Sequence, residues 1–331
     1  MNTRQTMMRS LGHLLALAFL ALPVFAIAQG TDAYPSRPIR LIVPVPPGGP
    51  SDLAARALSE SLREELGQPL VIVNRPGAAG TLASSLALQA PPDGYTLLLS
   101  LPSAQISSPM LMEKPPYDGA KNFTPIGSFI RTTAVLLVNT TVPVRDFKGL
   151  VDHAKAHPGA LNYGSTGIGS SPHLVMELVK LRTGMKIVHV PYTGGAAMIQ
   201  ALMSGELQVA FGELNSSMPW IKSGKLIPLA IVSEKRSPLL PDVPSLVKDK
   251  VLDTPADFWM GLAGPPGLPA VIAKRLNRAL GKAVEAPGMK QFYANTASAP
   301  MTGSPEDFAS LWVAEQRRWA EVIHVNGIRA E

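Results

Sequence analysis

A glycine-rich turn between a short apolar strand and a helix occurs twice in this chain, and it constrains both the fold and the ligand. The first copy covers residues 39–52 and the second covers residues 161–173. In each copy, glycines precede a Ser next to a Pro, which suit the cap and the first helical position. The free N–H groups of a helix start carry partial positive charge and form an anion site. Two such turns predict two lobes that hold one small anion.

Short apolar strands alternate with amphipathic helices along the rest of the chain. Strands are expected at 39–45, 70–73, 95–99, 135–138, near Leu161, and at 186–190, 207–211, 225–232 and 258–263. Helices are expected at 53–66, 82–89, 147–156, 172–182, 196–203, 269–284 and 305–325. This alternation predicts parallel sheets covered by helices. Ligands of such sheets bind at the carboxyl ends of the strands.

The alternating pattern restarts near Val135, which predicts a second α/β unit that is not a tandem repeat of the first. We expect the C-terminal helices to return to the first lobe. The predicted organisation is a discontinuous lobe 1 over 34–135 and 258–331 and a lobe 2 over 136–257. The two crossings, near Val135 and near Trp259, would then form a hinge.

The N-terminus has the pattern of a signal peptide over residues 1–28. Arg4 and Arg9 precede an apolar run over 11–27, and small residues flank Ile27, which predicts cleavage near Ala28. An uncleaved membrane anchor is the alternative, but the run is shorter than the roughly 20 residues that a membrane span needs. The pattern therefore predicts an exported, soluble product.

Composition excludes several classes of site. The chain has no cysteine, which excludes disulfides, thiolate metal ligands and a cysteine nucleophile. The formal charge is +6, but the basic residues are scattered, whereas a nucleic-acid footprint is a concentrated patch. The six histidines are dispersed and show no metal-binding spacing. Residues 167–169 supply only half of a dinucleotide-binding Gly-x-Gly-x-x-Gly, and Pro172 occupies the third glycine position. We expect no nucleic-acid partner, metal or cofactor.

An ordered set of short motifs extends over nearly the whole mature chain. The set comprises 34–40, 47–49 with Asp52, 67–69, 74–77, 92–97, 161–165, 169–171 with His173, 189–192, 235–238 and 240–244. These motifs resemble those of the substrate-binding proteins of tripartite tricarboxylate transporters, the Bug family of periplasmic receptors. The resemblance implies an α/β, type II periplasmic-binding-protein fold with two doubly wound lobes and a ligand cleft between them. It also implies capture of a small organic carboxylate in the periplasm and delivery to membrane transporter subunits.

Three positions depart from the pattern of that family. Pro50-Ser51 follows the first glycine pair, where relatives usually have a small residue and then Thr or Ser. Thr193 stands where many relatives carry Lys. The stretch 211–215 lacks the Asp-Asn pair that often follows its Phe. The last two departures remove a cation and change the wall of the pocket.

The candidate ligand contacts come from the two glycine-rich turns and from two further loops at strand ends. They are Pro47, Gly48, Gly49, Ser51, Asp52, Ser103, Ser165, Thr166, Gly169, Ser170, Ser171, His173, Tyr192, Thr193 and Gly194. Backbone N–H groups and serine hydroxyls would hold a carboxylate without a side-chain cation. For Asp52, capping of its own helix start is the favoured interpretation. His173 has two interpretations, a cleft contact and packing at its helix start.

The leading hypothesis is a monomeric receptor with no catalytic residues and no cofactor. A serine hydrolase is one alternative, with Ser165 or Ser170 and His173 as a triad, but no Gly-x-Ser-x-Gly elbow is present. A sensor component that presents solute to a membrane kinase is another alternative. The sequence does not separate this role from uptake.

Overall fold

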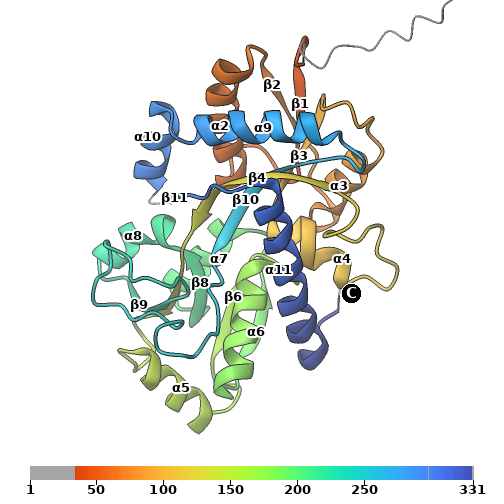
Figure 1. Ribbon diagram of the computed structural model, residues 1–331. Helices are drawn as coiled ribbons and strands as arrows, with labels where there is room; N and C mark the ends of the chain where they lie inside the picture. The colour runs from red at the N-terminus through yellow and green to blue at the C-terminus, as the bar shows by residue number, and fades with distance from the viewer. Residues whose placement is uncertain (1–33, 297, 330–331) are drawn as a thin grey trace, which may run out of the picture. The chain divides into compact units, whose positions relative to one another are not determined.

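Two mixed β-sheets form the framework of the computed structural model, which describes residues 34–296 and 298–329 except the side chain of Asn215 (Figure 1). The predicted signal peptide and its cleavage site lie outside the described residues. The first sheet contains β1 (Ile39–Val43), β2 (Leu70–Asn74), β3 (Thr96–Ser100), β4 (Thr124–Thr132), β10 (Phe258–Gly264) and β11 (Ala299–Pro300). Its strand order is β11-β4-β10-β3-β1-β2.

The second sheet contains the middle of the chain. Its strands are β5 (Ala134–Asn139), β6 (Asn162–Ser165), β7 (Val188–Pro191), β8 (Val209–Glu213) and β9 (Leu226–Ile231). Their order is β7-β6-β8-β5-β9. In each sheet, the strand that follows directly after the chain arrives from the other sheet lies in an interior position. This strand is β5, after β4, in the second sheet and β10, after β9, in the first.

Those entering strands make the sheets mixed rather than wholly parallel, which corrects the expectation from the alternating pattern. β1 pairs in parallel with β2 and β3, and β6 pairs in parallel with β7 and β8. β10 runs antiparallel to β3 and β4, and β5 runs antiparallel to β8 and β9. The reason is topological, because each entering strand crosses from the other sheet and does not return over a helix as a parallel strand must.

Helices cover the faces of both sheets, and several end as the sequence predicts. The helices around the first sheet are α2 (Pro50–Leu66), α3 (Thr81–Leu88), α4 (Ser108–Met110), α9 (Ala270–Ala283) and α10 (Pro287–Thr296), with short turns η2 (Ala78–Gly80) and η3 (Ser103–Ser107). Those of the second sheet are α5 (Phe147–Ala156), α6 (Ser171–Thr183), α7 (Gly195–Ser204) and α8 (Leu214–Lys222). α2 ends at Gly67 with φ +68, a left-handed conformation that glycine adopts without a Cβ clash.

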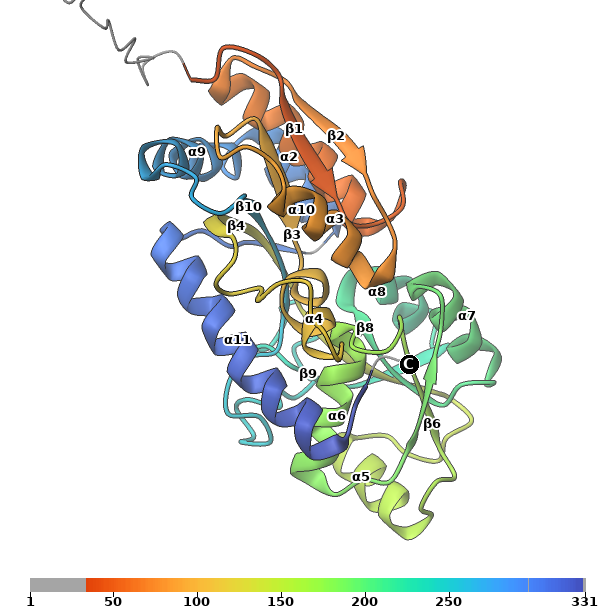
Figure 2. The same cartoon turned by 90° about the vertical axis from the view of Figure 1, so that its right-hand side faces the viewer.

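The long C-terminal helix α11 (Pro305–Asn326) contacts elements that belong to both sheets. It packs against β4 of the first sheet and against α6, which covers the second (Figures 1 and 2). A shared apolar core includes Trp312 and Trp319 of this helix together with Val175 of α6. Ser107 also donates a 2.6 Å hydrogen bond to the carbonyl oxygen of Gly169. The two halves are therefore joined along one side by packing and hydrogen bonding.

None of the helices in the described part of the chain is both long enough and apolar enough to cross a bilayer.

Candidate functional site

A large pocket lies at the carboxyl ends of the parallel strands of both sheets. Its volume is about 760 Å³, within the usual range for small-molecule sites. The segments that follow β1, β3, β6, β7 and β8 contribute lining residues, and the crossing strand β10 contributes Phe258, Trp259 and Met260. Strand-end loops are where open α/β sheets bind ligands, so the topology explains the position of the pocket.

Four helices begin at this pocket. Its lining includes Ser51 in the first turn of α2, Ser171 at the start of α6, Gly195 at the start of α7 and Ser216 in the first turn of α8. Within the described residues, none of these four helices has a hydrogen bond from a capping side chain to its first turn. The N–H groups in the first turns of α2, α6 and α7 are therefore available to a ligand, and the dipoles of these helices favour an anion there. In α8 the N–H of Leu214 already donates to the carbonyl oxygen of Thr133, and Glu213 immediately precedes this helix.

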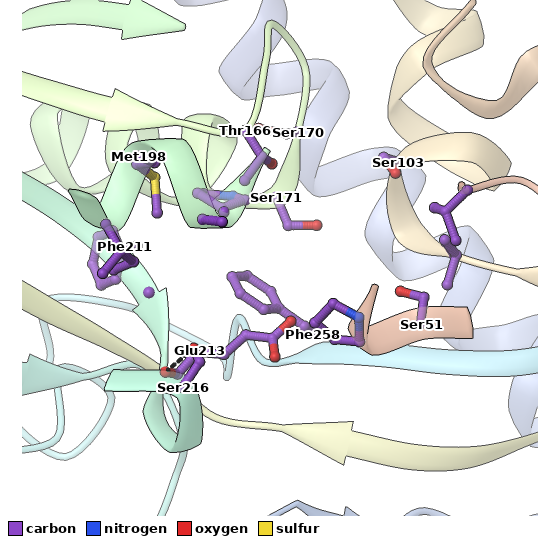
Figure 3. A pocket seen from close by; sticks show the side chains of 18 of the residues that line it. Ser51, Ser103, Thr166, Ser170, Ser171, Met198, Phe211, Glu213, Ser216 and Phe258 are labelled. Carbon is purple, nitrogen blue, oxygen red and sulfur yellow. Dashed lines mark hydrogen bonds between the residues drawn. The ribbon is translucent and has the colours of Figure 1, made fainter. Parts of the chain in front are cut away.

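Five of the candidate residues from the sequence line this pocket. They are Ser51, Ser103, Thr166, Ser170 and Ser171. They come from three strand ends, and Figure 3 shows their short side chains around one side of the cavity, with the Ser171 hydroxyl directed into it. Ser103 begins η3, a single turn of π-helix, a feature that is frequent at functional sites. The arrangement offers hydroxyl donors beside free N–H groups, a combination that suits a carboxylate.

The other ten candidates lie outside the lining. They are Pro47, Gly48, Gly49, Asp52, Ser165, Gly169, His173, Tyr192, Thr193 and Gly194. Several have partners of their own in the structure: the hydroxyl of Tyr192 donates to Glu206 at 3.4 Å, for example. These residues support the turns that carry the lining residues, and a direct ligand contact stays a prediction for them.

Asp52 stabilises the first glycine turn from inside. It is 1% exposed, and its carboxylate accepts hydrogen bonds from the Gly48 N–H, Arg56 and Asn74. Burial alone would raise the pKa of this carboxyl, but these hydrogen bonds outweigh burial and lower its pKa to about 2. The side chain therefore fixes the entry to α2, close to the capping role that the sequence favoured.

His173 lies behind the second glycine turn, not in the pocket lining. The Gly169 N–H donates to its Nδ1 at 2.9 Å, and its ring stacks on that of His189 with centroids 3.9 Å apart. The second ring in turn bonds the hydroxyl of Ser165 through Nε2 at 2.7 Å. Burial is the main cause that lowers the pKa of His173 to about 3, and burial likewise lowers that of His189 to about 4. Both rings are neutral at pH 7 and hold the turn as packing and hydrogen-bonding groups.

This burial predicts a pH dependence of stability that the variant His173→Asn removes. The folded pKa of about 3 lies below the unfolded value of about 6.5, so the unfolded chain takes up the proton first. The stability that the neutral ring provides is present above pH 6.5 and is lost as pH falls towards 3. At pH 5 the loss is about 2 kcal/mol. Asn keeps an acceptor for the Gly169 N–H but does not titrate.

The measurement is urea unfolding of wild type and His173→Asn at pH 7 and at pH 5. We expect the drop in unfolding free energy between the two pH values to be about 2 kcal/mol smaller in the variant. Comparing the two drops cancels the contribution of titrating groups that do not contact His173. His189, which stacks on it, is the one coupled histidine in the described part of this cluster, and His189→Asn is compared in the same way. Equal drops would contradict the buried, neutral state of His173.

The candidate contacts from the sequence omitted much of the apolar wall and the one charged residue among the described residues that line the pocket, although the stretch 211–215 was expected to change that wall. The apolar part includes Met198, Phe211, Trp220, Phe258 and Met260, and the charged residue is Glu213. Trp259 was expected to pack at the hinge. It lines the pocket and also packs edge-on against Phe308, with the ring centroids 5.3 Å apart. A signal was available for Glu213, since alternation along β8 places it on the same face as Phe211.

No group of three or more His, Cys, Asp or Glu in the described ranges is placed to hold a metal ion.

Comparison with known proteins identifies the class to which this fold and pocket belong. Residues 54–328 match the model of the tripartite tricarboxylate transporter family receptor. The protein BugT of Bordetella pertussis is 33% identical, over 96% of this chain and 97% of its own length. The solved structure of R. palustris Rpa4515 with adipate has a TM-score of 0.79 at 32% identity, covering 89% of this chain and 99% of that one. MatC from Rhodopseudomonas palustris with bound malate has a TM-score of 0.76 at 27% identity, covering 88% of this chain and all of that one.

The molecule is thus a solute-binding protein of the periplasmic type, with the two-lobed α/β fold of that class. It belongs to the tripartite tricarboxylate transporter receptor family, to which the Bug proteins are related. The resemblance drawn from the sequence motifs and the fold class that it implied are confirmed.

Proposed function

We propose that this protein is an exported periplasmic receptor that binds a small organic carboxylate and presents it to the membrane subunits of a tripartite tricarboxylate-type transporter. The observation that carries the proposal is the convergence of three helix starts, those of α2, α6 and α7, and several serine hydroxyls on one pocket. Each charge-assisted hydrogen bond to a carboxylate contributes about 1.5–3 kcal/mol. No cationic side chain is needed, since the N–H groups and dipoles supply the positive potential.

The bound molecules of two structural neighbours support this ligand class. Rpa4515 is described with adipate and MatC with malate, both of them dicarboxylates. Their likeness to this chain extends over nearly its whole described length. Export would follow from the N-terminal pattern, with cleavage near Ala28, and the mature receptor would act as a monomer.

The proposal includes two lobes that close over the ligand. Lobe 1 would comprise 34–135 and 258–331 and lobe 2 would comprise 136–257, with the crossings as the hinge. Lining residues from both sheets, such as Ser51 and Ser171, then contact one ligand together. Binding would shift the population towards the closed state only as far as the ligand's differential affinity allows.

The two alternative functions are less well supported. For a hydrolase, Ser165 is fully buried and its hydroxyl is bonded to His189, while the Ser170 hydroxyl donates to the Gly167 carbonyl oxygen at 2.7 Å. His173 accepts from the Gly169 N–H, and the partners of the two serine hydroxyls are His189 and the Gly167 carbonyl oxygen instead. For a sensor component, the matched family is one of transporter receptors. We therefore propose a receptor without catalytic activity.

A thermal-shift screen of the mature protein tests the proposed function. The panel contains mono- and dicarboxylates, neutral sugars and divalent metal salts at equal concentrations. We expect stabilisation by carboxylates, by roughly 5 °C when the ligand is in hundredfold excess over its Kd. Stabilisation only by sugars or only by metal ions would refute the ligand class.

A further inference from the structure

Glu213 has an isolated carboxyl group in a pocket that we expect to bind an anion. It ends β8 and immediately precedes α8, and it is the one ionisable residue in the lining within the described residues. Figure 3 shows its carboxylate directed into the cavity near Phe258. No described group donates a hydrogen bond to this carboxylate, whereas its backbone oxygen accepts from the hydroxyls of Ser216 and Ser217. Burial raises the pKa of Glu213, with no nearby cation to oppose that effect.

Glu213 has no cationic side chain beside it in the described lining, and the start of α8 next to it is the one source of positive potential that the described chain gives it there. The pocket lining around it includes the aromatic side chains of Phe211, Trp220, Phe258 and Trp259. A buried charge without a partner is costly, and the cost falls when a cation pairs with it. Aromatic rings add to this preference, because their faces attract ammonium groups. The chain itself provides no Lys, Arg or His in the described lining, so the ligand is the source of the cation.

The two sides of the cavity therefore differ in sign. Ser51, Ser103 and Ser171 lie with the uncapped helix starts, where the potential is positive. Glu213 lies apart from them on the end of β8, as Figure 3 shows. A molecule that spans the cavity meets donors at one end and an acceptor at the other.

We propose that Glu213 binds a cationic nitrogen of the ligand, so that the pocket selects zwitterions in which a carboxylate and an ammonium group are joined by an apolar body. The inference rests on the proposed function, since it assigns the opposite end of the ligand to the helix starts. To the proposed function it adds Glu213 as a residue that determines specificity and zwitterions as the class of ligand. A second carboxylate at Glu213 would meet a like charge, or would require Glu213 to take up a proton.

Matched trios of acids test this assignment by calorimetry at pH 7. Each trio has the same carbon skeleton with an ammonium, a carboxylate or a methyl group at the far end. The trios are 4-aminobutanoate, succinate and butanoate; 6-aminohexanoate, adipate and hexanoate; and 4-(aminomethyl)benzoate, terephthalate and 4-methylbenzoate. We expect the amino member to bind most tightly in any trio that binds, by roughly tenfold or more.

The variant Glu213→Gln isolates the charge. The glutamine is close in shape and needs no cation, so the variant should fold, which circular dichroism and its melting temperature verify. We expect it to lose about tenfold or more in affinity for the amino member while the affinity for the methyl member stays unchanged. The matched control is Glu234→Gln, the same change at an exposed residue outside the lining, which should keep the wild-type order.

The outcomes distinguish a failure of the proposed role of Glu213 from a failure of the proposed carboxylate receptor. Tightest binding of the dicarboxylate, proton uptake on its binding, or an order that Glu213→Gln leaves unchanged would overturn the role of Glu213 and leave the carboxylate receptor standing. Failure of all nine acids to bind, together with failure of every carboxylate in the thermal-shift panel, would overturn the proposed function and this inference with it. Should Glu213→Gln fail to fold, Glu213→Ala provides the same comparison, because it also removes the charge.

Discussion

Ser171→Glu is expected to weaken carboxylate binding by about a hundredfold or more while leaving the fold intact. Ser171 is the first residue of α6, and Figure 3 shows its hydroxyl directed into the cavity. A fixed carboxylate there occupies the positive potential that the ligand needs and repels it. Two like charges about 4 Å apart interact by roughly 4 kcal/mol at the effective dielectric of a protein surface. A glutamate in a first turn also complements the helix dipole, so stability should not fall.

The measurement is calorimetry with the carboxylate that gives the largest thermal shift in the wild type. Ser310→Glu is the matched control, because it makes the same change on the exposed face of α11, far along the chain from the pocket lining. We expect the control to bind as the wild type does. Retained affinity in Ser171→Glu would show that the start of α6 does not hold the ligand.

Gly261→Ala is expected to destabilise the fold by about 3 kcal/mol. Gly261 lies in the crossing strand β10, where it pairs with Ser100 of β3 and Ser128 of β4. A Cβ at this position would lie 2.3 Å from Cζ of Phe308 and 2.7 Å from the carbonyl oxygen of Gly127. The second neighbour is backbone within a sheet, so it cannot move without breaking strand pairing.

Gly281→Ala is the matched control for that substitution. Gly281 lies in α9, and a Cβ there would meet nothing within 4 Å. Replacing a helix-interior glycine with alanine should stabilise the protein by up to about 1 kcal/mol. Urea unfolding compares both variants with the wild type. A loss below about 1 kcal/mol for Gly261→Ala would show that β10 has room that the structure does not give it.

Local patterns predicted those elements whose ends carry strong signals. The helix at Phe147–Ala156 was predicted with its observed bounds, because Asp146 caps its start and a glycine follows soon after its end. The long strand β4 was missed, since Pro125, Gly127 and Arg131 interrupt its apolar pattern. Helix α8 was missed as well, because its first turn is rich in polar residues and Pro219 lies inside it. In both cases tertiary contacts determine the secondary structure of a segment whose local preference is weak.

The candidate site likewise contains residues that local sequence patterns predict and residues that they do not. Ser51, Ser170 and Ser171 could be predicted because the residues that cap a helix are adjacent in the sequence, and Ser103 and Thr166 because they come just after predicted strands. Glu213 was not among the candidate ligand contacts, although its stretch was expected to change the pocket wall, since the strand before it was expected to end at Phe211. Phe258 and Met260 reach the pocket only because β10 enters the first sheet directly after the chain leaves the second. Contacts that depend on a crossing strand between distant segments have no local sequence signal.

The central claim is that the helix starts hold the carboxylate of the ligand, and one calorimetric comparison tests it most directly. The best-binding acid from the thermal-shift screen is compared with its own primary amide, which has nearly the same shape without the charge. The account predicts that the amide binds roughly a hundredfold more weakly than the acid. Equal affinity for the acid and the amide would contradict it, since the pocket would then recognise the shape of the ligand and not its negative charge.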